Sequence, residues 1–192
     1  MGVMIDIIGS TIIRGAIVLI ILNLNVSLNN SLTQKTVRAA LKQKTVVPAQ
    51  VLTDDIRLAG YNQVVIAGQK LFAVAKADEI QFLADLNSDS TADVVHYYLG
   101  TAPVGSTHRV LYRQLNGGTP FELARDVISL SFAYYNSLGT QIAPGVNKGG
   151  IKSISVKLKI ESNIQVSEGM GTGNAAQYEG AYWERTIFPQ NL

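Results

Sequence analysis

The residues best suited to chemistry in this chain form a short run of oxygen donors between positions 85 and 93. Carboxylate and amide side chains stand there at alternate positions, namely Asp85, Asn87, Asp89 and Asp93. Oxygen donors at this spacing are typical of a calcium-binding loop. Such a loop also needs a glycine and a final bidentate glutamate, where this chain has Ser90 and His96. Two interpretations stay open: a calcium site, or a solvated turn rich in Asp and Asn between two strands.

The sequence contains no set of residues that predicts catalysis. The chain has no cysteine and only two histidines, His96 and His108, which excludes thiolate chemistry, disulfides, cysteine-ligated zinc and a histidine-rich metal site. It has no Gly-x-Ser-x-Gly motif of a serine hydrolase. The glycine-rich segment 169–174 fits neither the dinucleotide nor the Walker pattern, so we interpret it as a surface loop. We therefore expect no enzymatic activity and no cofactor, with calcium as the alternative.

The overall charge is nearly balanced. Sixteen basic and 14 acidic residues among 192 leave a formal charge of +2, which does not predict nucleic acid as a main partner. Four of the bases form one run, Lys35, Arg38, Lys42 and Lys44. We interpret this run as a solvated helix face, with contact to DNA as the less favoured alternative.

The first third of the chain is the most apolar part. No charged residue occurs between Arg14 and Lys35, and at about 1.5 Å per residue this stretch is long enough to cross a bilayer as a helix. It lacks the basic start and the small-x-small cleavage site of a secretory signal peptide. We therefore expect a retained membrane segment, residues 1–34, that carries a globular part.

Two ionisable residues, Asp6 and Arg14, interrupt this apolar segment. Such a group at membrane depth costs several kcal/mol unless it is paired. Eight positions on a helix place the two charges about 12 Å apart on similar faces, too far to pair within one chain. We expect them to pair between chains in a helical bundle. The alternative is that each extends to an opposite membrane interface.

The helix is expected to continue beyond the apolar segment. Between positions 23 and 31, Asn and Ser alternate with aliphatic residues, a pattern that suits a helix or a short strand. An amphipathic helix over 35–60 follows, with Pro48 expected to kink it and Gly60 to end it. Its predicted apolar stripe contains Val37, Leu41, Val47, Val51, Leu52, Ile56 and Ala59. A continuous helix over 4–59 would be about 80 Å long.

Residues 61–192 have the shorter periodicity of strands. Apolar and polar residues alternate most clearly over 127–134 and 151–160, as in strands with one buried face. The expected strands are 64–66, 70–76, 80–85, 94–99, 109–115, 127–136, 151–161 and 178–188, with a short helical turn at 122–125. These elements predict an α+β fold, in which an antiparallel sheet covers the amphipathic half of the helix within a globular domain over 35–192.

The ordered set of segments after the helix resembles type IV pilin-like proteins, specifically W-type minor pilins and J-type minor pseudopilins of type II secretion. The segments that carry the resemblance are 52–61 (LTDDIRLAGY), 78–87 (DEIQFLADLN), 110–113 (VLYR), 127–135, the strand from 151, and 183–192 (WERTIFPQNL). The resemblance implies a pilin-like fold and a subunit without enzymatic activity.

The same resemblance implies where the protein acts and with what partners. Subunits of this kind stand in the inner membrane before assembly and then form an extracellular filament with copies of themselves, driven by an assembly machinery. Their helices bundle in the filament core and their β-domains form its surface. We therefore expect a structural filament subunit. The alternatives are a minor or priming pseudopilin of a type II secretion-like system, and a single-pass membrane-anchored β-domain that binds a ligand.

The N-terminus departs from the family pattern. Members begin with a basic leader and a glycine, followed by a phenylalanine and, at the fifth mature position, a glutamate. This chain has Gly2 without a basic leader, and Asp6 stands near the place of that glutamate. The resemblance implies that Asp6 sets the register between subunits, with Arg14 of a neighbour in place of the N-terminal amine, because a buried charge without its partner is strongly destabilising.

Overall fold

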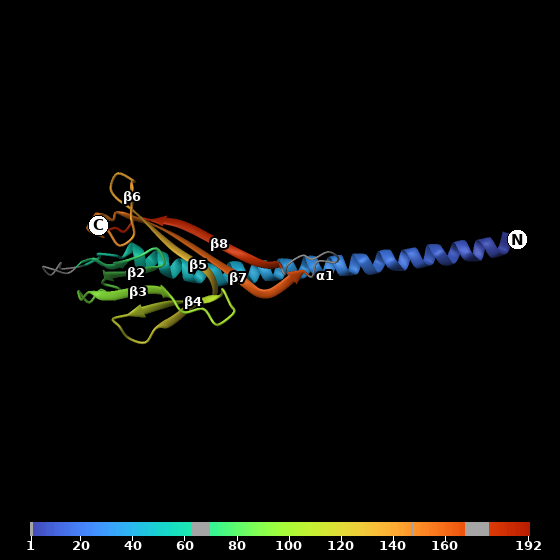
Figure 1. Cartoon of the computed structure of the whole chain (residues 1–192), viewed down its shortest axis with the longest axis horizontal. Helices are drawn as coiled ribbons and strands as arrows, with labels where there is room; N and C mark the ends of the chain where they lie inside the picture. Colours follow the sequence, from blue (N-terminus) through green and yellow to red (C-terminus); the bar gives the residue numbers. More distant parts are fainter. Residues whose placement is uncertain (1, 63–69, 147, 168–176) are drawn as a thin grey trace.

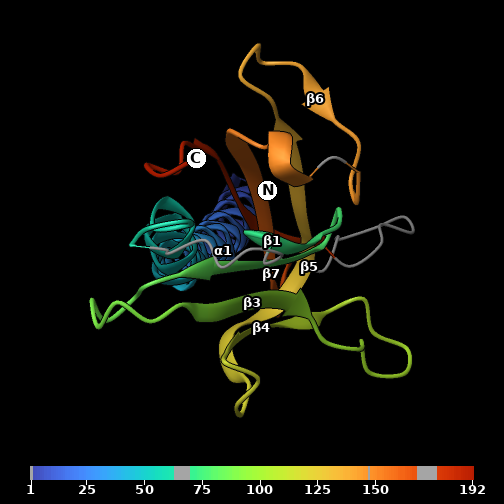
Figure 2. The ribbon, with the colours of Figure 1, turned by 90° about the vertical axis from the view of Figure 1, so that its left-hand side faces the viewer.

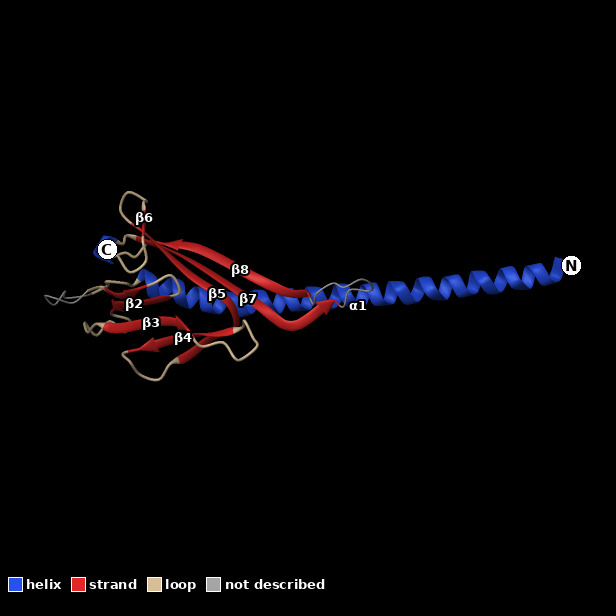
Figure 3. Cartoon of the chain, in the orientation of Figure 1, coloured by secondary structure: helices blue, strands red, loops and turns tan. Residues whose placement is uncertain are grey.

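The computed structural model describes residues 2–62, 70–146, 148–167 and 177–192, and it consists of one long helix and an antiparallel sheet (Figures 1 and 3). The helix is α1 (Gly2–Arg57). The strands and a short 3-10 helix follow it: β1 (Phe72–Ala75), β2 (Glu79–Ala84), β3 (Asp93–Leu99), β4 (Arg109–Leu115), β5 (Phe121–Tyr135), β6 (Gln141–Ile142), η1 (Lys148–Gly150), β7 (Ser153–Ser167) and β8 (Gln177–Ile187).

The strands form one sheet in the order β1-β2-β3-β4-β5-β7-β8, with β6 paired to β5. Each of these pairs is antiparallel. The sheet curves around the second half of α1, with β5 and β7 beside the helix and β3 and β4 below it in the view of Figure 2. The predicted α+β fold with a helix on an antiparallel sheet is confirmed.

The second half of α1 packs on the sheet, mainly against β7 and β8. Leu41, Ala49, Leu52 and Ile56 are buried, with exposures of 0 to 4 %. Together with Thr45 they recur every three or four residues, so they share one face of the helix. This face meets the apolar side of the sheet and forms the core of the domain.

One member of the predicted apolar stripe does not belong to this buried face. Val47 is 60 % exposed, whereas Thr45 and Thr53 occupy buried positions on the helix. Each threonine hydroxyl donates to the carbonyl four residues earlier, at 2.7 Å. This bond satisfies the hydroxyl inside the core, so a polar residue can replace an aliphatic one there.

Pro48 does not interrupt the helix. α1 runs through it without a break and ends nine residues later at Arg57. Proline cannot donate to the carbonyl of Lys44, but Pro48 lies on the buried side of the helix. Packing of the neighbouring turns against the sheet therefore holds the helix together, and the Asn- and Ser-rich stretch 23–31 is helical as well.

The expected strands correspond to the observed ones except at three places, one of which is the short strand β6 (Gln141–Ile142), which the sequence did not predict. Residues 64–66 lie outside the described residues. The expected helical turn at 122–125 is wrong, because β5 begins at Phe121. Pairing of Arg113 with Phe121 and of Tyr112 with Glu122 draws this segment into the sheet, so a long-range contact overrides the local propensity.

A sharp turn at Gly60 ends the helical region, as predicted. Gly60 has φ +79°, and its N–H donates to the carbonyl of Leu83 at 2.9 Å. A Cβ atom at this position would lie 2.9 Å from the Asn191 carbonyl oxygen. The turn therefore joins the end of the helix to β2 and to the C-terminal segment.

We expect Gly60→Ala to lower the free energy of unfolding by about 1–3 kcal/mol, because it combines a left-handed backbone with a backbone clash. Gly139→Ala is the matched control. It has φ +73° but no atom within 4 Å of the added Cβ, so it should lose only about 1 kcal/mol. Urea unfolding of both variants measures the difference, and equal losses would mean that the contact with Asn191 contributes nothing.

Candidate functional site

The first half of α1 extends beyond the sheet (Figure 1), and its exposed side chains form a continuous apolar surface. Every residue from Ile17 to Leu22 is more than half exposed, with values of 51 to 62 %. Since six consecutive residues cover all sides of a helix, this half is apolar all round. Its most apolar window has a mean hydropathy of 2.1, and none of that window is buried within the described chain.

A helix of this kind cannot be stable as a free element in water. Each Å² of exposed apolar surface costs roughly 25 cal/mol relative to burial, and a continuous patch of this extent marks a surface that contacts a membrane or another protein. By length and composition, α1 is also able to cross a membrane. The apolar helix and the sheet together fit a membrane-anchored α+β protein.

The structure places the two charges predicted to set the register on this apolar half. Arg14 is exposed on α1. Asp6 belongs to the same helix, and its side chain lies outside the described residues. Pairing of these two groups between copies stays a prediction.

The segment of alternating oxygen donors is a turn between β2 and β3 that is organised around Asp85. The Asp85 carboxylate accepts hydrogen bonds from the backbone N–H groups of Asp89 at 3.2 Å and Ser90 at 2.9 Å, and from the Asn62 side chain at 2.7 Å. Although burial opposes its charged form, these hydrogen bonds hold the pKa of Asp85 below its ordinary value. The carboxylate thus stabilises the turn itself.

The other carboxylates of this segment also have hydrogen-bond partners within the protein. Asp89 accepts from the Asn87 side chain and from the Thr91 N–H, each at 2.7 Å, and Asp93 accepts from the Asn116 side chain at 2.7 Å. Among the described residues, no group of three or more His, Asp or Glu side chains is placed to hold a metal ion. The arrangement supports the interpretation as a turn, and we derive no calcium chemistry from it.

The two histidines lie in separate ionic clusters. His96 on β3 has its Nε2 atom 2.9 Å from Glu79, and its ring lies 4.7 Å from that of Tyr98. His108, just before β4, lies 3.8 Å from Asp126 and 3.6 Å from Glu161. These contacts connect strands to one another, so both histidines are structural.

A buried ionic cluster that the sequence did not reveal joins the end of α1 to the sheet. The Asp55 carboxylate accepts from the Tyr97 hydroxyl at 2.5 Å and from Arg113 Nε at 2.7 Å. Tyr97 is fully buried and Asp55 is 8 % exposed. The three residues come from α1, β3 and β4, so the cluster fixes the helix relative to two strands.

Tyr97 gives the domain a specific response to alkaline pH. Burial, together with the negative charge of Asp55, raises the pKa of Tyr97 well above its ordinary value. In the unfolded chain this phenol ionises near pH 10, so the unfolded state loses its proton first and the free energy of unfolding falls as the pH rises above about 10. We expect this fall to be shallower in Tyr97→Phe. Denaturant unfolding between pH 9 and 11 measures it, and identical slopes would contradict the assignment.

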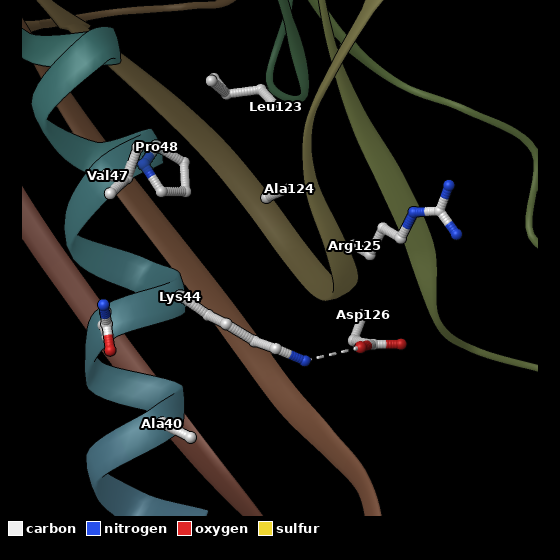
Figure 4. Close-up of a pocket in the computed structure, with 9 residues that line it drawn as sticks. Ala40, Lys44, Val47, Pro48, Leu123, Ala124, Arg125 and Asp126 are labelled. Carbon is white, nitrogen blue, oxygen red and sulfur yellow. Dashed lines mark ion pairs between the residues drawn. The ribbon is translucent and has the colours of Figure 1, made fainter.

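A groove lies where α1 passes the beginning of β5 (Figure 4). It has a volume of about 600 Å³ and is lined by Ala40, Gln43, Lys44, Val47, Pro48, Leu123, Ala124, Arg125 and Asp126. The Lys44 ammonium reaches across the groove and lies 3.7 Å from the Asp126 carboxylate. Asp126 has φ 60°, a backbone conformation that Asp tolerates, at an irregular part of β5. The groove is therefore mostly apolar, with charged groups at its edge.

No protein-family model matches the chain, and a search of curated proteins finds no match. The arrangement in space is nonetheless pilin-like, because one long apolar N-terminal helix packs by its second half on an antiparallel sheet (Figure 1). The exposed first half of α1 is the feature that any function must explain.

Proposed function

We propose that this protein is a structural subunit of a type IV pilus-like filament, which polymerises through the first half of α1. The observation that carries the proposal is the uncovered apolar surface of that half, which no described part of the chain buries. Copies that bundle these helices would bury it and leave the sheets outside. In the unassembled subunit a membrane would cover the same surface, so the proposal includes an inner-membrane stage followed by a cell-surface filament.

The separation of the two parts along the molecule supports a bundle. Beyond the sheet, α1 projects as an isolated rod away from the β-domain (Figure 1). Its residues 2–33 would measure about 48 Å. Rods of this length can pack side by side while the wider β-domains stay at a larger radius. A membrane anchor requires only an apolar helix that is long enough to cross the bilayer. A bundle also requires that this helix extend far enough beyond the β-domain for several copies to pack without steric clash.

The test is the association state of the full chain in lipid bilayers. Energy transfer between donor- and acceptor-labelled copies is expected to persist when the protein is diluted with excess lipid, because helix contacts hold the copies together. A mixture with a free transmembrane peptide as the acceptor is the control for random proximity. Transfer that falls to this control level on dilution would favour the single-pass membrane-anchored β-domain instead.

A further inference from the structure

The side of α1 that faces away from the sheet carries no charge over most of the helix. Leu41, Leu52 and Ile56 mark the side that packs on the sheet. Between positions 15 and 53, α1 has four charged residues, namely Lys35, Arg38, Lys42 and Lys44. At about 100° of rotation per residue, each of them lies roughly 90° or more from the line opposite the buried side. The opposite side is therefore uncharged over this whole stretch.

In the second half of α1 this uncharged side is open to solvent. We call it the back face, and it consists of Thr36, Ala39, Ala40, Gln43, Val46, Val47 and Gln50. All of these residues are exposed, and the two valines have exposures of 62 and 60 %. β5 approaches α1 at the side of Lys44, which pairs with Asp126, so this strand borders the back face and does not cover it. The same line of the helix continues through Leu32 and Ile21, so the back face extends the apolar surface of the first half.

A neighbouring copy is the partner that fits this face. The proposed filament has the helices at its centre and the sheets outside, so the side of α1 away from the sheet is the side that other helices meet. We infer that neighbouring copies pack their back faces against each other, with the helices parallel and one helix displaced by seven residues along the other. The inference rests on the proposed function and names the contact through which copies associate. Side-chain size, hydrogen bonding and charge each favour this displacement.

Side-chain size on the back face repeats with a spacing of seven. Ala39 and Ala40 precede Val46 and Val47 by seven positions. A displacement of seven residues, or about 10.5 Å, places an alanine of one copy opposite a valine of the other at both edges of the contact. A small residue opposite a large one lets two helices approach closely without a void. Alignment without displacement would place valine opposite valine and alanine opposite alanine.

Hydrogen bonding at the centre of the back face favours the same displacement. Gln50 donates from its amide nitrogen to both carboxylate oxygens of Asp54, at 3.0 and 2.9 Å, and its own carbonyl oxygen stays free to accept. The amide of Gln43, seven positions earlier, has no hydrogen-bond partner within the described part of the chain. The displacement places the Gln43 amide of one copy beside the Gln50 carbonyl oxygen of the other. This contact satisfies both groups when water leaves the interface.

The charges of the first half are also consistent with this displacement. Arg14 lies near the line of the back face, so alignment without displacement would place two guanidinium groups beside each other. Like charges repel strongly in an apolar contact, because the dielectric constant is low. A displacement of seven residues brings Asp6 of one copy and Arg14 of the other within about 1.5 Å of the same height. This agrees with the pairing of these two residues between copies that the sequence predicts.

Disulfide formation between full-length chains in detergent micelles tests this contact, because micelles leave the copies free to take either alignment. The chain has no cysteine, so each bond reports only the positions introduced. Oxidation of Gln43→Cys mixed with affinity-tagged Gln50→Cys is expected to give a covalent heterodimer. Lys35→Cys mixed with tagged Lys42→Cys is the matched control, since these exposed residues are also seven positions apart but lie roughly 90° from the contact. We expect at least a fivefold lower yield with the control.

The outcomes separate the inference from the proposed function. A homodimer of Gln43→Cys alone at the yield of the heterodimer would show alignment without displacement and overturn the inference. A heterodimer yield no higher than that of the control, although energy transfer in the same micelles shows that the copies associate, would overturn the inference and leave the filament proposal intact. Loss of both the heterodimer and the energy transfer would overturn both.

Exchange of side-chain size gives a second test. Ala39→Leu is expected to reduce the heterodimer yield at least fivefold, because two large residues then face each other. Adding Val46→Ala to the same chain is expected to restore the yield. Both residues are exposed within one copy, and Lys42→Leu, an apolar enlargement outside the contact, should leave the yield unchanged. No recovery with Val46→Ala, or an equal loss with Lys42→Leu, would contradict the contact between Ala39 and Val46.

Discussion

Ile20→Lys is expected to abolish association of the full chain, with at least a hundredfold decrease in the apparent association constant. Ile20 is 58 % exposed within the uncovered half of α1, and association is proposed to bury it among other helices. A lysine at the centre of an apolar helix costs about 2.5–3.5 kcal/mol in a membrane, and a buried cation without a partner costs about 3–5 kcal/mol. Either penalty is large relative to typical helix contacts.

Energy transfer in bilayers measures this effect, and two variants control it. Ile20→Leu keeps the apolar surface and should associate normally. Leu138→Lys introduces the same charge in the turn after β5, where Leu138 is 86 % exposed, and should also associate normally. Association of Ile20→Lys at the wild-type level would show that the apolar half does not make the contacts between copies.

Asp55→Ala is expected to produce the largest loss of stability, about 3–5 kcal/mol, since removing one member of a buried ion pair leaves the other uncompensated. Without Asp55, Arg113 loses the carboxylate 2.7 Å from its Nε atom, and the Tyr97 hydroxyl loses its acceptor. Burial opposes the charged form of Arg113, but hydrogen bonding with Asp55 outweighs it and keeps the pKa of Arg113 raised. A guanidinium stays protonated in proteins even without its partner, so the variant leaves this charge uncompensated.

The neighbouring Asp54 provides a matched control. Asp54 is exposed and accepts hydrogen bonds from Gln50 at 2.9 and 3.0 Å, so Asp54→Ala should change the free energy of unfolding by less than about 0.5 kcal/mol. Denaturant unfolding of the full chain in detergent measures both variants. Similar losses for the two would mean that the buried cluster does not hold the helix on the sheet.

Much of the architecture could be predicted because it depends on local periodicity. The uncharged stretch after Arg14 specifies an apolar helix, and alternation over 127–134 specifies a strand with one buried face. What failed depends on contacts between distant residues. The segment at 122–125 became part of β5 by pairing with β4, and Val47 turned outward because the sheet packs on the face that contains Leu52 and Ile56.

The candidate site could be predicted only in part for the same reason. The exposed apolar half and its charges, Asp6 and Arg14, are visible in the sequence. The groove needs α1 and β5 side by side, and the cluster of Asp55, Tyr97 and Arg113 joins residues 42 and 58 positions apart. No local sequence pattern specifies contacts between residues so far apart in the chain. The adjacent pair Asp54 and Asp55 is visible in the sequence, but the sequence does not show which of the two is buried.

Electron cryo-microscopy of filaments sheared from cells that express the full chain tests the central claim most directly. The account predicts a helical polymer of this chain, with residues 2–33 of each copy bundled at the centre and the β-sheets at the surface. Recovery of the chain only from the membrane fraction, as a monomer and without filaments, would contradict the account.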